Sequence, residues 1–299
     1  MAVVGGTVGR LLLTGLLLQG SPAPVFESQR AWEHLRQLVA IGPRPAGSPA
    51  IEQSRHYITQ QLAAAGISVT EQAWEDRTPI GPMRMVNLVA TIPAAGSGAH
   101  ADRLVIGGHY DTKRFREFRF VGANDGGSSA AFLIELARVL KARRNTLTIE
   151  LLFLDGEEAV VEWEGNDHTY GSRHYVAEAR RTGTLAAIKA FILVDMIGDR
   201  DLEIKRDMNS TPWLTDIIWS AADRLRLDAF SPARTQVEDD HLPFIAAGVP
   251  SVDIIDLEYP AWHTPDDTLD AVSARSLQTV GDALLEALPQ IEALLKIAR

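Results

Sequence analysis

The stretch LLFLDGEEA, residues 151–159, joins an apolar, strand-like segment to three carboxylates within four residues. Burying acids at the end of a strand costs free energy unless something compensates their charge, and a metal cation is the usual compensator. The neighbouring residues Glu157 and Glu158 can divide the work, because adjacent side chains on an irregular turn point in different directions. One carboxylate can then bind a metal while the other faces a substrate and transfers protons. Taken alone, the stretch is equally compatible with a solvated acidic turn.

The composition is that of an ordinary globular protein, and it limits the residue types that could bind a metal or act as nucleophiles. The chain has 299 residues, enough for one large α/β domain or two small ones, of which 46% are hydrophobic and 23% charged. Its formal net charge of -10 argues against nucleic acid as a main partner, since no basic stripe is available to neutralise phosphates. The absence of cysteine excludes disulfides, cysteine nucleophiles and thiolate-bound zinc. Any metal must therefore be held by His, Asp and Glu.

The N-terminal segment differs from the rest of the chain. Arg10 precedes an apolar run over 11–18, which is too short to span a bilayer because about 20 apolar residues are needed. The run is typical of a secretory signal, although Pro24 makes the preceding Ser-Pro-Ala a poor cleavage site; a short, loosely packed helix is the alternative. We therefore expect residues 1–26 to be a targeting segment of an exported (periplasmic or secreted) protein without a stable membrane span. Residues 27–299 are expected to form one folded domain.

Strand-like and helix-like segments alternate over nearly the whole chain. Apolar residues at helical spacing predict helices over 28–39, 52–65, 128–140, 172–180, 213–225, 240–247 and 272–297. Strand-like runs lie at 67–69, 86–92, 104–108, 146–154, 190–196 and 251–255. The alternation predicts a single-domain α/β fold with a mostly parallel central sheet flanked by helices on both faces. In such sheets the site lies at the carboxyl ends of the strands.

Acids and histidines gather at these predicted strand ends. His109 follows one strand, Asp125 directly precedes a helix, Asp195 ends another strand, and His263 lies in a late loop. Each has an ordinary structural alternative; Asp125, for example, could simply cap the helix that follows it. Together they lie where the site of an α/β sheet belongs, and carboxylates with imidazoles suit zinc when thiolates are absent. The combined pattern predicts a metal site far more specifically than any one residue does.

Several motifs along the chain resemble one known family. They are RPAGSP (44–49), HYDTK (109–113), FVGA (120–123), DGEEA (155–159) with Trp163, YGSRH (170–174), DDHLPF (239–244), GVP (248–250) and WHT (262–264). In this order they resemble the zinc-dependent M28 aminopeptidase clan and, within it, the animal-type glutaminyl-peptide cyclotransferases, or glutaminyl cyclases. The resemblance covers residues 27–297 and implies a zinc aminopeptidase-like catalytic domain.

The resemblance also implies a metal centre and a catalytic residue. One zinc ion would be held by Asp125, Glu158 and His263, with the fourth position open to water or substrate, as is usual for catalytic zinc. Glu157 would be the general base and acid. The substrates would be peptides or proteins with an N-terminal glutamine, which the enzyme would convert to pyroglutamate with release of ammonia.

The remaining implied residues surround this centre. Asp195 and Asp239 would be acids hydrogen-bonded in a network with the catalytic glutamate, and Trp163, Trp262 and Lys113 would border the substrate pocket. The glutamine carries its own nucleophile, the α-amine, and its own electrophile, the γ-amide. Zinc would polarise the γ-carbonyl, and aromatic walls would hold the substrate curled for attack within the same molecule.

The chain departs from the animal pattern at three places. Gly108 and Ala130 stand where the animal enzymes place a disulfide, and we expect this loss to affect stability more than chemistry. Asp253 stands where a histidine of the active-site network is expected, which leaves the detail of that network open. The loop over 257–261 is not a clean match.

Two other functions remain open from the sequence. A two-zinc aminopeptidase of the same clan would use His109 and Asp195 for a second metal, with Asp125 as the bridge, and all three are present. A catalytically silent binding domain is the other alternative, but a site that no longer works has no physical reason to keep costly acids together. The tryptophans Trp163 and Trp262, with the DDH motif at 239–241, favour the cyclase over the aminopeptidase. The sequence does not indicate an oligomeric state.

Overall fold

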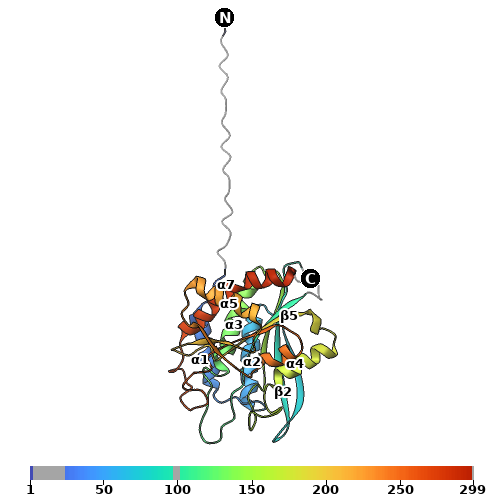
Figure 1. Cartoon of the computed structure of the whole chain (residues 1–299), viewed down its shortest axis with the longest axis vertical. Helices are drawn as coiled ribbons and strands as arrows, with labels where there is room; N and C mark the ends of the chain where they lie inside the picture. Colours follow the sequence, from blue (N-terminus) through green and yellow to red (C-terminus); the bar gives the residue numbers. More distant parts are fainter. Residues whose placement is uncertain (3–23, 97–101, 298–299) are drawn as a thin grey trace.

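Six strands form one mixed sheet at the centre of the computed structural model, which describes residues 1–2, 24–96 and 102–297 (Figure 1). In spatial order they are β1 (Val69–Thr78), β2 (Gly81–Ile92), β4 (Thr148–Leu154), β3 (Arg103–His109), β5 (Ile188–Asp195) and β8 (Ser251–Ile255). β3 pairs in parallel with β4 and with β5, and β5 pairs in parallel with β8. The β1–β2 and β2–β4 pairings are antiparallel, so a parallel centre carries one antiparallel edge.

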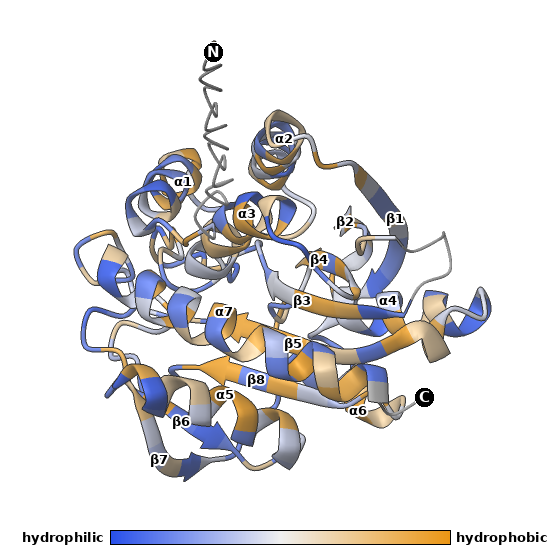
Figure 2. Ribbon diagram, turned by 90° about the horizontal axis from the view of Figure 1, so that it is seen from above, coloured by the Kyte–Doolittle hydropathy of each residue, from blue (hydrophilic) through white to orange (hydrophobic). Residues whose placement is uncertain are grey.

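Helices cover both faces of this sheet. One face packs against α1 (Ser28–Ile41), α2 (Pro49–Ala64), α3 (Gly127–Ala142), α5 (Pro212–Leu225) and α7 (Ala274–Ile297). The other face packs against α4 (Tyr170–Arg181) and α6 (His241–Ala246). Successive strand residues serve opposite cores, since Ile192 and Val194 belong to the first and Phe191 and Leu193 to the second. Figure 2 shows the hydrophobic strands β3, β5 and β8 enclosed between the helices.

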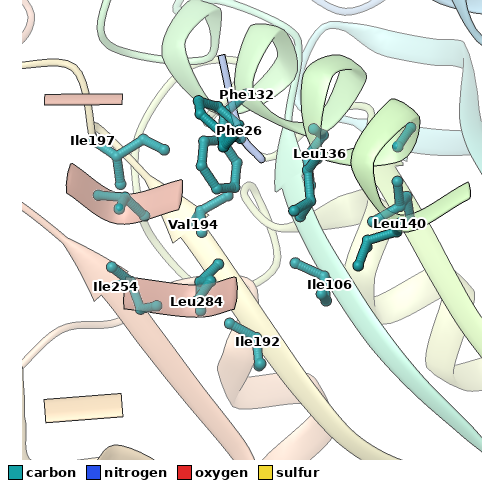
Figure 3. Close-up of a cluster of buried hydrophobic side chains, with 14 of the residues drawn as sticks. Phe26, Ile106, Phe132, Leu136, Leu140, Ile192, Val194, Ile197, Ile254 and Leu284 are labelled. Carbon is teal, nitrogen blue, oxygen red and sulfur yellow. The ribbon is translucent and has the colours of Figure 1, made fainter. Parts of the chain in front are cut away.

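The larger core extends to the start of the described chain. Figure 3 shows Phe26 against Phe132 of α3, close to Val194 of β5, and the two phenyl ring centroids are 5.0 Å apart. Of the targeting segment expected over 1–26, residues 3–23 lie outside the described residues. Within the part of the chain that the structure describes, no helix is both long enough and apolar enough to cross a membrane.

The predicted α/β architecture is confirmed, with two differences in detail. Three of the five strand pairings are parallel, and the short strand expected at 67–69 is the ten-residue β1, paired with β2 as a hairpin. Seven of the ten residues of β1 are polar or charged, and half of the strand is exposed, because it is an edge strand that pairs with one neighbour only. It therefore lacks the apolar alternation that marks a half-buried strand.

Three shorter elements also escaped the sequence pattern. The strands β6 (Ile204–Asp207) and β7 (Phe230–Thr235) form a separate parallel pair, and residues Leu185–Ala187 form a 3₁₀ turn before β5. The start of α2 lies three residues before the predicted one. Ser48 accepts a hydrogen bond from the backbone N–H of Ile51, and Pro49 occupies the first helical position, which is a favourable helix start.

At the position that corresponds to the disulfide of the animal enzymes, strand β3 packs closely against helix α3. A side-chain Cβ at Gly108 would lie 2.6 Å from the carbonyl oxygen of Val194 and 2.7 Å from Cβ of Ser129. Ala130, the next residue of α3 after Ser129, is fully buried. β3 and α3 therefore approach each other too closely at Gly108 for any side chain.

A buried arginine joins the loops that follow β3. The guanidinium of Arg44, which is completely buried, donates hydrogen bonds to the carbonyl oxygens of Tyr110, Val121 and Gly122 at 2.9, 2.6 and 2.9 Å. Its backbone N–H donates to the hydroxyl of Thr112 at 3.0 Å. One side chain thus holds the loop at 110–112 against the turn at 121–122, and both lead into the acidic edge of the sheet.

Replacing Arg44 with methionine should strongly destabilise the fold. The change leaves three buried carbonyls without partners, and each such loss costs about 1 kcal/mol or more. We expect the free energy of unfolding in urea to fall by at least about 3 kcal/mol. The matched control is Arg36→Met, because Arg36 is exposed and pairs with exposed Glu33; it should change stability by less than about 0.5 kcal/mol. Equal losses for the two variants would contradict this role of Arg44.

Candidate metal centre and active site

The parallel strands deliver their polar ends to one edge of the sheet. β3 ends at His109, β5 ends at Asp195, and the turn at 155–158 follows β4 directly. His109 pairs with Leu154 in the parallel register of β3 and β4, so the two strands end at the same level. The site therefore lies where the carboxyl ends of parallel strands place it.

Three of these side chains form a group that fits a zinc ion. The Nε2 atom of His263 lies 3.3 Å from Oδ2 of Asp125 and 3.2 Å from Oε1 of Glu158. Ligand atoms around tetrahedral zinc, at bond lengths of about 2.0 Å, are separated by about 3.3 Å. Both carboxylates are buried, and the three donor atoms lie within 4.8 Å of one another. Donor chemistry and spacing thus agree with the predicted metal site.

A second group shares one of these residues. Nε2 of His109 lies 3.0 Å from Oδ1 of Asp195 and 3.3 Å from Oδ1 of Asp125. Asp125 therefore turns one oxygen to each group, which is the position of a bridging ligand. The donor spacing admits a second cation at His109 and Asp195.

The two adjacent glutamates point in different directions. Glu158 faces His263, whereas Oε2 of Glu157 lies 3.6 Å from Nδ1 of His109. The carboxylate of Asp111 accepts hydrogen bonds from the backbone N–H groups of Glu157 and Glu158 at 3.2 and 3.4 Å. Asp111 thereby fixes the turn that directs Glu158 towards His263 and Glu157 towards His109.

The third acid of the opening stretch serves the fold. Asp155 is fully buried and accepts hydrogen bonds from the backbone N–H of Val86 at 2.8 Å and from the hydroxyl of Tyr110 at 3.3 Å. Burial raises the pKa of Asp155 to about 7, and the nearby Asp111 carboxylate adds to the shift. Its contacts join β2 to the end of β4, away from the metal-facing residues.

The buried acids at this edge repel one another. Burial raises the pKa of Glu157 well above its ordinary value; Glu158 and Asp239 raise it further, whereas His109 opposes the shift. Burial also raises the pKa of Glu158 to about 7, with Asp125 adding to it. The site therefore holds more negative charge than its low-polarity surroundings favour, and a bound divalent cation would offset it.

His263 is held in an unusual backbone conformation. Its φ of 55° lies in the left-handed region, which costs free energy for a residue other than glycine. Its ring is packed edge-on by Phe115 and Phe120, with centroid separations of 5.7 and 6.0 Å. Burial lowers the pKa of His263, but Asp125 and Glu158 more than compensate and raise it to about 9.

A cavity of about 450 Å³ opens over the group formed by Asp125, Glu158 and His263. All nine residues predicted from the sequence line it: Lys113, Asp125, Glu157, Glu158, Trp163, Asp195, Asp239, Trp262 and His263. The sequence did not identify its other walls, which include Met196, Gln236, Glu238, Ile255 and Leu257. The structure thus brings the predicted site residues together around one space, while their individual roles stay predictions.

The border residues of this cavity are anchored differently. The indole of Trp163 stacks on the ring of His168, with centroids 4.2 Å apart and planes 11° apart. Trp262 lies against His263 at 4.5 Å and remains 43% exposed, the most open of the predicted residues. Nζ of Lys113 lies 3.6 Å from Oε2 of Glu158, so its ammonium group faces the metal-binding side of the cavity.

The buried carboxylate of Asp253 lies near a histidine from another element. Asp253 on β8 is completely buried, and its Oδ2 lies 3.6 Å from Nδ1 of His241 at the start of α6. Nε2 of His241 lies 3.1 Å from Oδ2 of Asp207. Burial raises the pKa of Asp253 well above its ordinary value, and Asp239 and Asp195 add to the shift. The acid network behind the cavity thus extends to β8 and β6.

One organising residue escaped the sequence reasoning. Asp267 is fully buried, and its carboxylate accepts hydrogen bonds from the backbone N–H groups of Asn124 and Asp125 at 2.8 and 3.2 Å. It lies in the same loop as His263, but no motif spacing reveals that its partners are on a distant turn. Only the folded chain brings the two together.

Comparison with known proteins agrees with this geometry. The sequence profile of Peptidase family M28 matches residues 87–288. A glutaminyl-peptide cyclotransferase-like protein of Mus musculus is 34% identical over 275 residues, covering 81% of this chain and 70% of the relative. The glutaminyl-peptide cyclotransferase of Drosophila melanogaster is 31% identical over 270 residues, covering 80% and 75%.

A solved structure extends the likeness to the whole fold. The crystal structure of Acidobacteriales bacterium glutaminyl cyclase superposes with a TM-score of 0.86 at 41% identity, covering 92% of this chain and 98% of that one. These findings confirm the resemblance that the sequence motifs indicated. The chain belongs to Peptidase family M28 and, within it, to the glutaminyl-peptide cyclotransferases.

Proposed function

We propose a residue-level account of the reaction that this chain catalyses, the conversion of an N-terminal glutamine of a peptide or protein to pyroglutamate with release of ammonia. The observation that carries it is the division of the glutamate pair. Glu158 lies in a three-residue group with zinc-like spacing, and Glu157 lies beside that group without belonging to it. Both glutamates line the same cavity.

In this proposal Asp125, Glu158 and His263 hold one zinc ion. Bound zinc supplies a Lewis acid that polarises the γ-carbonyl of the substrate and stabilises the negative charge that develops on its oxygen. The fixed turn at Asp111 and the packed ring of His263 hold the ligands in place before the ion binds.

Glu157 is the proton carrier. It takes a proton from the attacking α-amine and returns one to the departing ammonia, so the same carboxyl group serves both halves of the reaction. Burial raises the pKa of Glu157 above the ordinary value of a glutamate, so this carboxylate binds a proton more readily than an exposed one. Asp195 and Asp239 border the same cavity and, in this account, belong to the network of acids around Glu157.

The cavity selects the substrate by shape and charge. A space of about 450 Å³ bordered by Trp163 and Trp262 suits a short, neutral side chain folded back towards its own amine. A substrate glutamate would add one more carboxylate to an acidic site and is therefore disfavoured. While the N-terminal residue is bound, the rest of the peptide extends out of the open side of the cavity, next to exposed Trp262.

A two-zinc aminopeptidase is the second candidate, because His109, Asp125 and Asp195 form a second group of possible ligands. The relatives and the solved structure favour the cyclotransferase. The two activities give different products, so analysis of the reaction products distinguishes the cyclotransferase from the aminopeptidase.

Incubation of the purified, zinc-loaded protein with a peptide that begins with glutamine should yield the cyclised peptide and ammonia. The peptide keeps its full length, because the bond that breaks is in the side chain. Mass spectrometry combined with an ammonia assay measures both products, and the same peptide beginning with asparagine is the control. Release of a free amino acid and a shortened peptide would identify the aminopeptidase instead.

Substitution of the two glutamates should separate chemistry from metal binding. Glu157→Gln should lower turnover by about 10³-fold or more while the protein keeps one zinc ion, since general acid–base catalysis contributes on this scale. Glu158→Gln should lose the zinc ion together with the activity, because it removes a charged ligand. Zinc content after gel filtration is the deciding readout. Loss of zinc from Glu157→Gln, with zinc retained by Glu158→Gln, would reverse the two assignments.

We also propose that the chain is exported. The apolar run over 11–18, preceded by Arg10, supports this proposal. Expression of the full chain in a Gram-negative host should place the enzyme in the periplasmic fraction, whereas a chain beginning at residue 24 should stay in the cytoplasm. Equal distribution of the two forms would contradict a targeting role for the segment.

A further inference from the structure

Two loops carry Trp163, Trp262 and His263 of the cavity border, and each ends in or near a buried aspartate, Asp167 or Asp267. We call residues 159–169 the Trp163 loop and residues 256–267 the His263 loop. The first connects the turn after β4 to α4, and the second follows β8. Both loops lie outside regular secondary structure, so their shape depends on contacts other than helix or strand hydrogen bonds.

We call a buried carboxylate that holds a loop together through several hydrogen bonds a brace. In the Trp163 loop this residue is Asp167. Its carboxylate accepts hydrogen bonds from three successive backbone N–H groups, those of Val160, Val161 and Glu162, at 3.1, 2.8 and 3.0 Å. The hydroxyl of Tyr170 donates a fourth bond at 2.7 Å. Burial alone would raise the pKa of Asp167, but these four bonds hold it below its ordinary value, so the group remains a carboxylate.

In the His263 loop the brace is Asp267. Besides the backbone N–H groups of Asn124 and Asp125, its carboxylate accepts a hydrogen bond from the hydroxyl of Tyr259 at 2.8 Å. Its own carbonyl oxygen accepts the N–H of Ala123 at 3.3 Å. The two braces therefore share one design: a buried carboxylate that collects neighbouring backbone N–H groups and one tyrosine hydroxyl.

The two braces act on different parts of the site. Asp167 closes the loop around Trp163, whose indole stacks on His168, the next residue after the brace. The tip of that loop is exposed at Glu162 and Glu164, so it has little apolar packing of its own to hold it. No residue of this loop belongs to either group of possible metal ligands among the described residues.

Asp267, in contrast, reaches both ends of the metal-binding group. It bonds the backbone of Asp125 directly, and together with Tyr259 it closes the segment that contains His263. Because His263 has a strained backbone, a fixed loop is needed to keep its ring directed at Asp125 and Glu158.

We propose that Asp267 and Asp167 are positioning residues with separate tasks: Asp267 sets the metal ligands Asp125 and His263, and Asp167 sets the substrate wall at Trp163. The proposal rests on the residue roles given under Proposed function. It assigns the metal ligands to Asp267 and the substrate wall to Asp167, so a substitution of either aspartate should disturb one of them without the other. An amide in place of either carboxylate keeps the size of the side chain but loses the charge and half of its acceptor capacity.

The test compares Asp267→Asn with Asp167→Asn, each acting as the control for the other. Zinc affinity is measured by competition with a chromogenic chelator, and kcat and KM are then measured with an N-terminal glutamine peptide at saturating zinc. Asp267→Asn should weaken zinc binding about 10-fold or more, with KM changed by less than about 3-fold once zinc is saturating. Asp167→Asn should leave zinc affinity within about 2-fold and raise KM about 10-fold, because a displaced wall weakens substrate positioning.

Milder variants keep the test valid if an asparagine variant does not fold. Tyr259→Phe and Tyr170→Phe each remove a single hydrogen bond from the respective brace and should show the same two profiles with smaller changes. Asp266→Asn and Glu164→Gln alter exposed acids in the same two loops and should match the unmodified enzyme in both readouts.

The separation of effects decides the outcome. If both asparagine variants only lower the melting temperature, with zinc affinity and KM unchanged, or if both change the two quantities alike, the proposal is overturned. Asp125→Asn serves as the reference for the metal site itself. If it retains zinc, the proposed ligand set is wrong and this inference fails with it. If it loses zinc while Asp267→Asn binds zinc normally, only the role of Asp267 is refuted.

Discussion

The structure depends on the burial of several carboxylates around one space at the carboxyl edge of the sheet. Asp125, Glu157 and Glu158 are each less than 10% exposed, and Asp195 and Asp239 line the same cavity. Such crowding is unfavourable unless a cation shares the space, and burial accordingly raises the pKa of Glu157. The fold brings the acids together at the carboxyl edge of the sheet, and a bound cation would offset their repulsion.

The surrounding structure works to hold these acids at fixed positions. Arg44 joins the loop after β3 to the turn before Asp125, Asp111 fixes the turn of the glutamate pair, and Asp267 closes the loop of His263 against Asp125. Each of these side chains uses backbone groups as partners, so the geometry is set before any ligand arrives. Pre-organised ligands and acids cost nothing to rearrange at the moment of reaction, which is how a small site gains catalytic power.

The architecture and the strand-end residues of the cavity were predictable from simple rules, whereas Trp163, Trp262, Lys113 and Asp239 were predicted from the family resemblance. Alternating elements predict a parallel centre, and strand ends such as His109 and Asp195 then meet at one edge. Most of β1 was missed, beyond the short run expected at 67–69, because a polar edge strand has no apolar alternation to show. Asp267 was missed because its function lies in hydrogen bonds to residues far away in the chain, which no local spacing encodes. The exact strand pairing likewise depends on packing that a single sequence does not display.

The central claim is that one zinc ion lies among Asp125, Glu158 and His263, with Glu157 left free. A crystal of the zinc-loaded protein, measured on both sides of the zinc absorption edge, tests it most directly. We predict a single anomalous peak within bonding distance of those three side chains and of none of the atoms of Glu157. A second peak of equal height at His109 and Asp195, or a peak bonded to Glu157, would contradict the account.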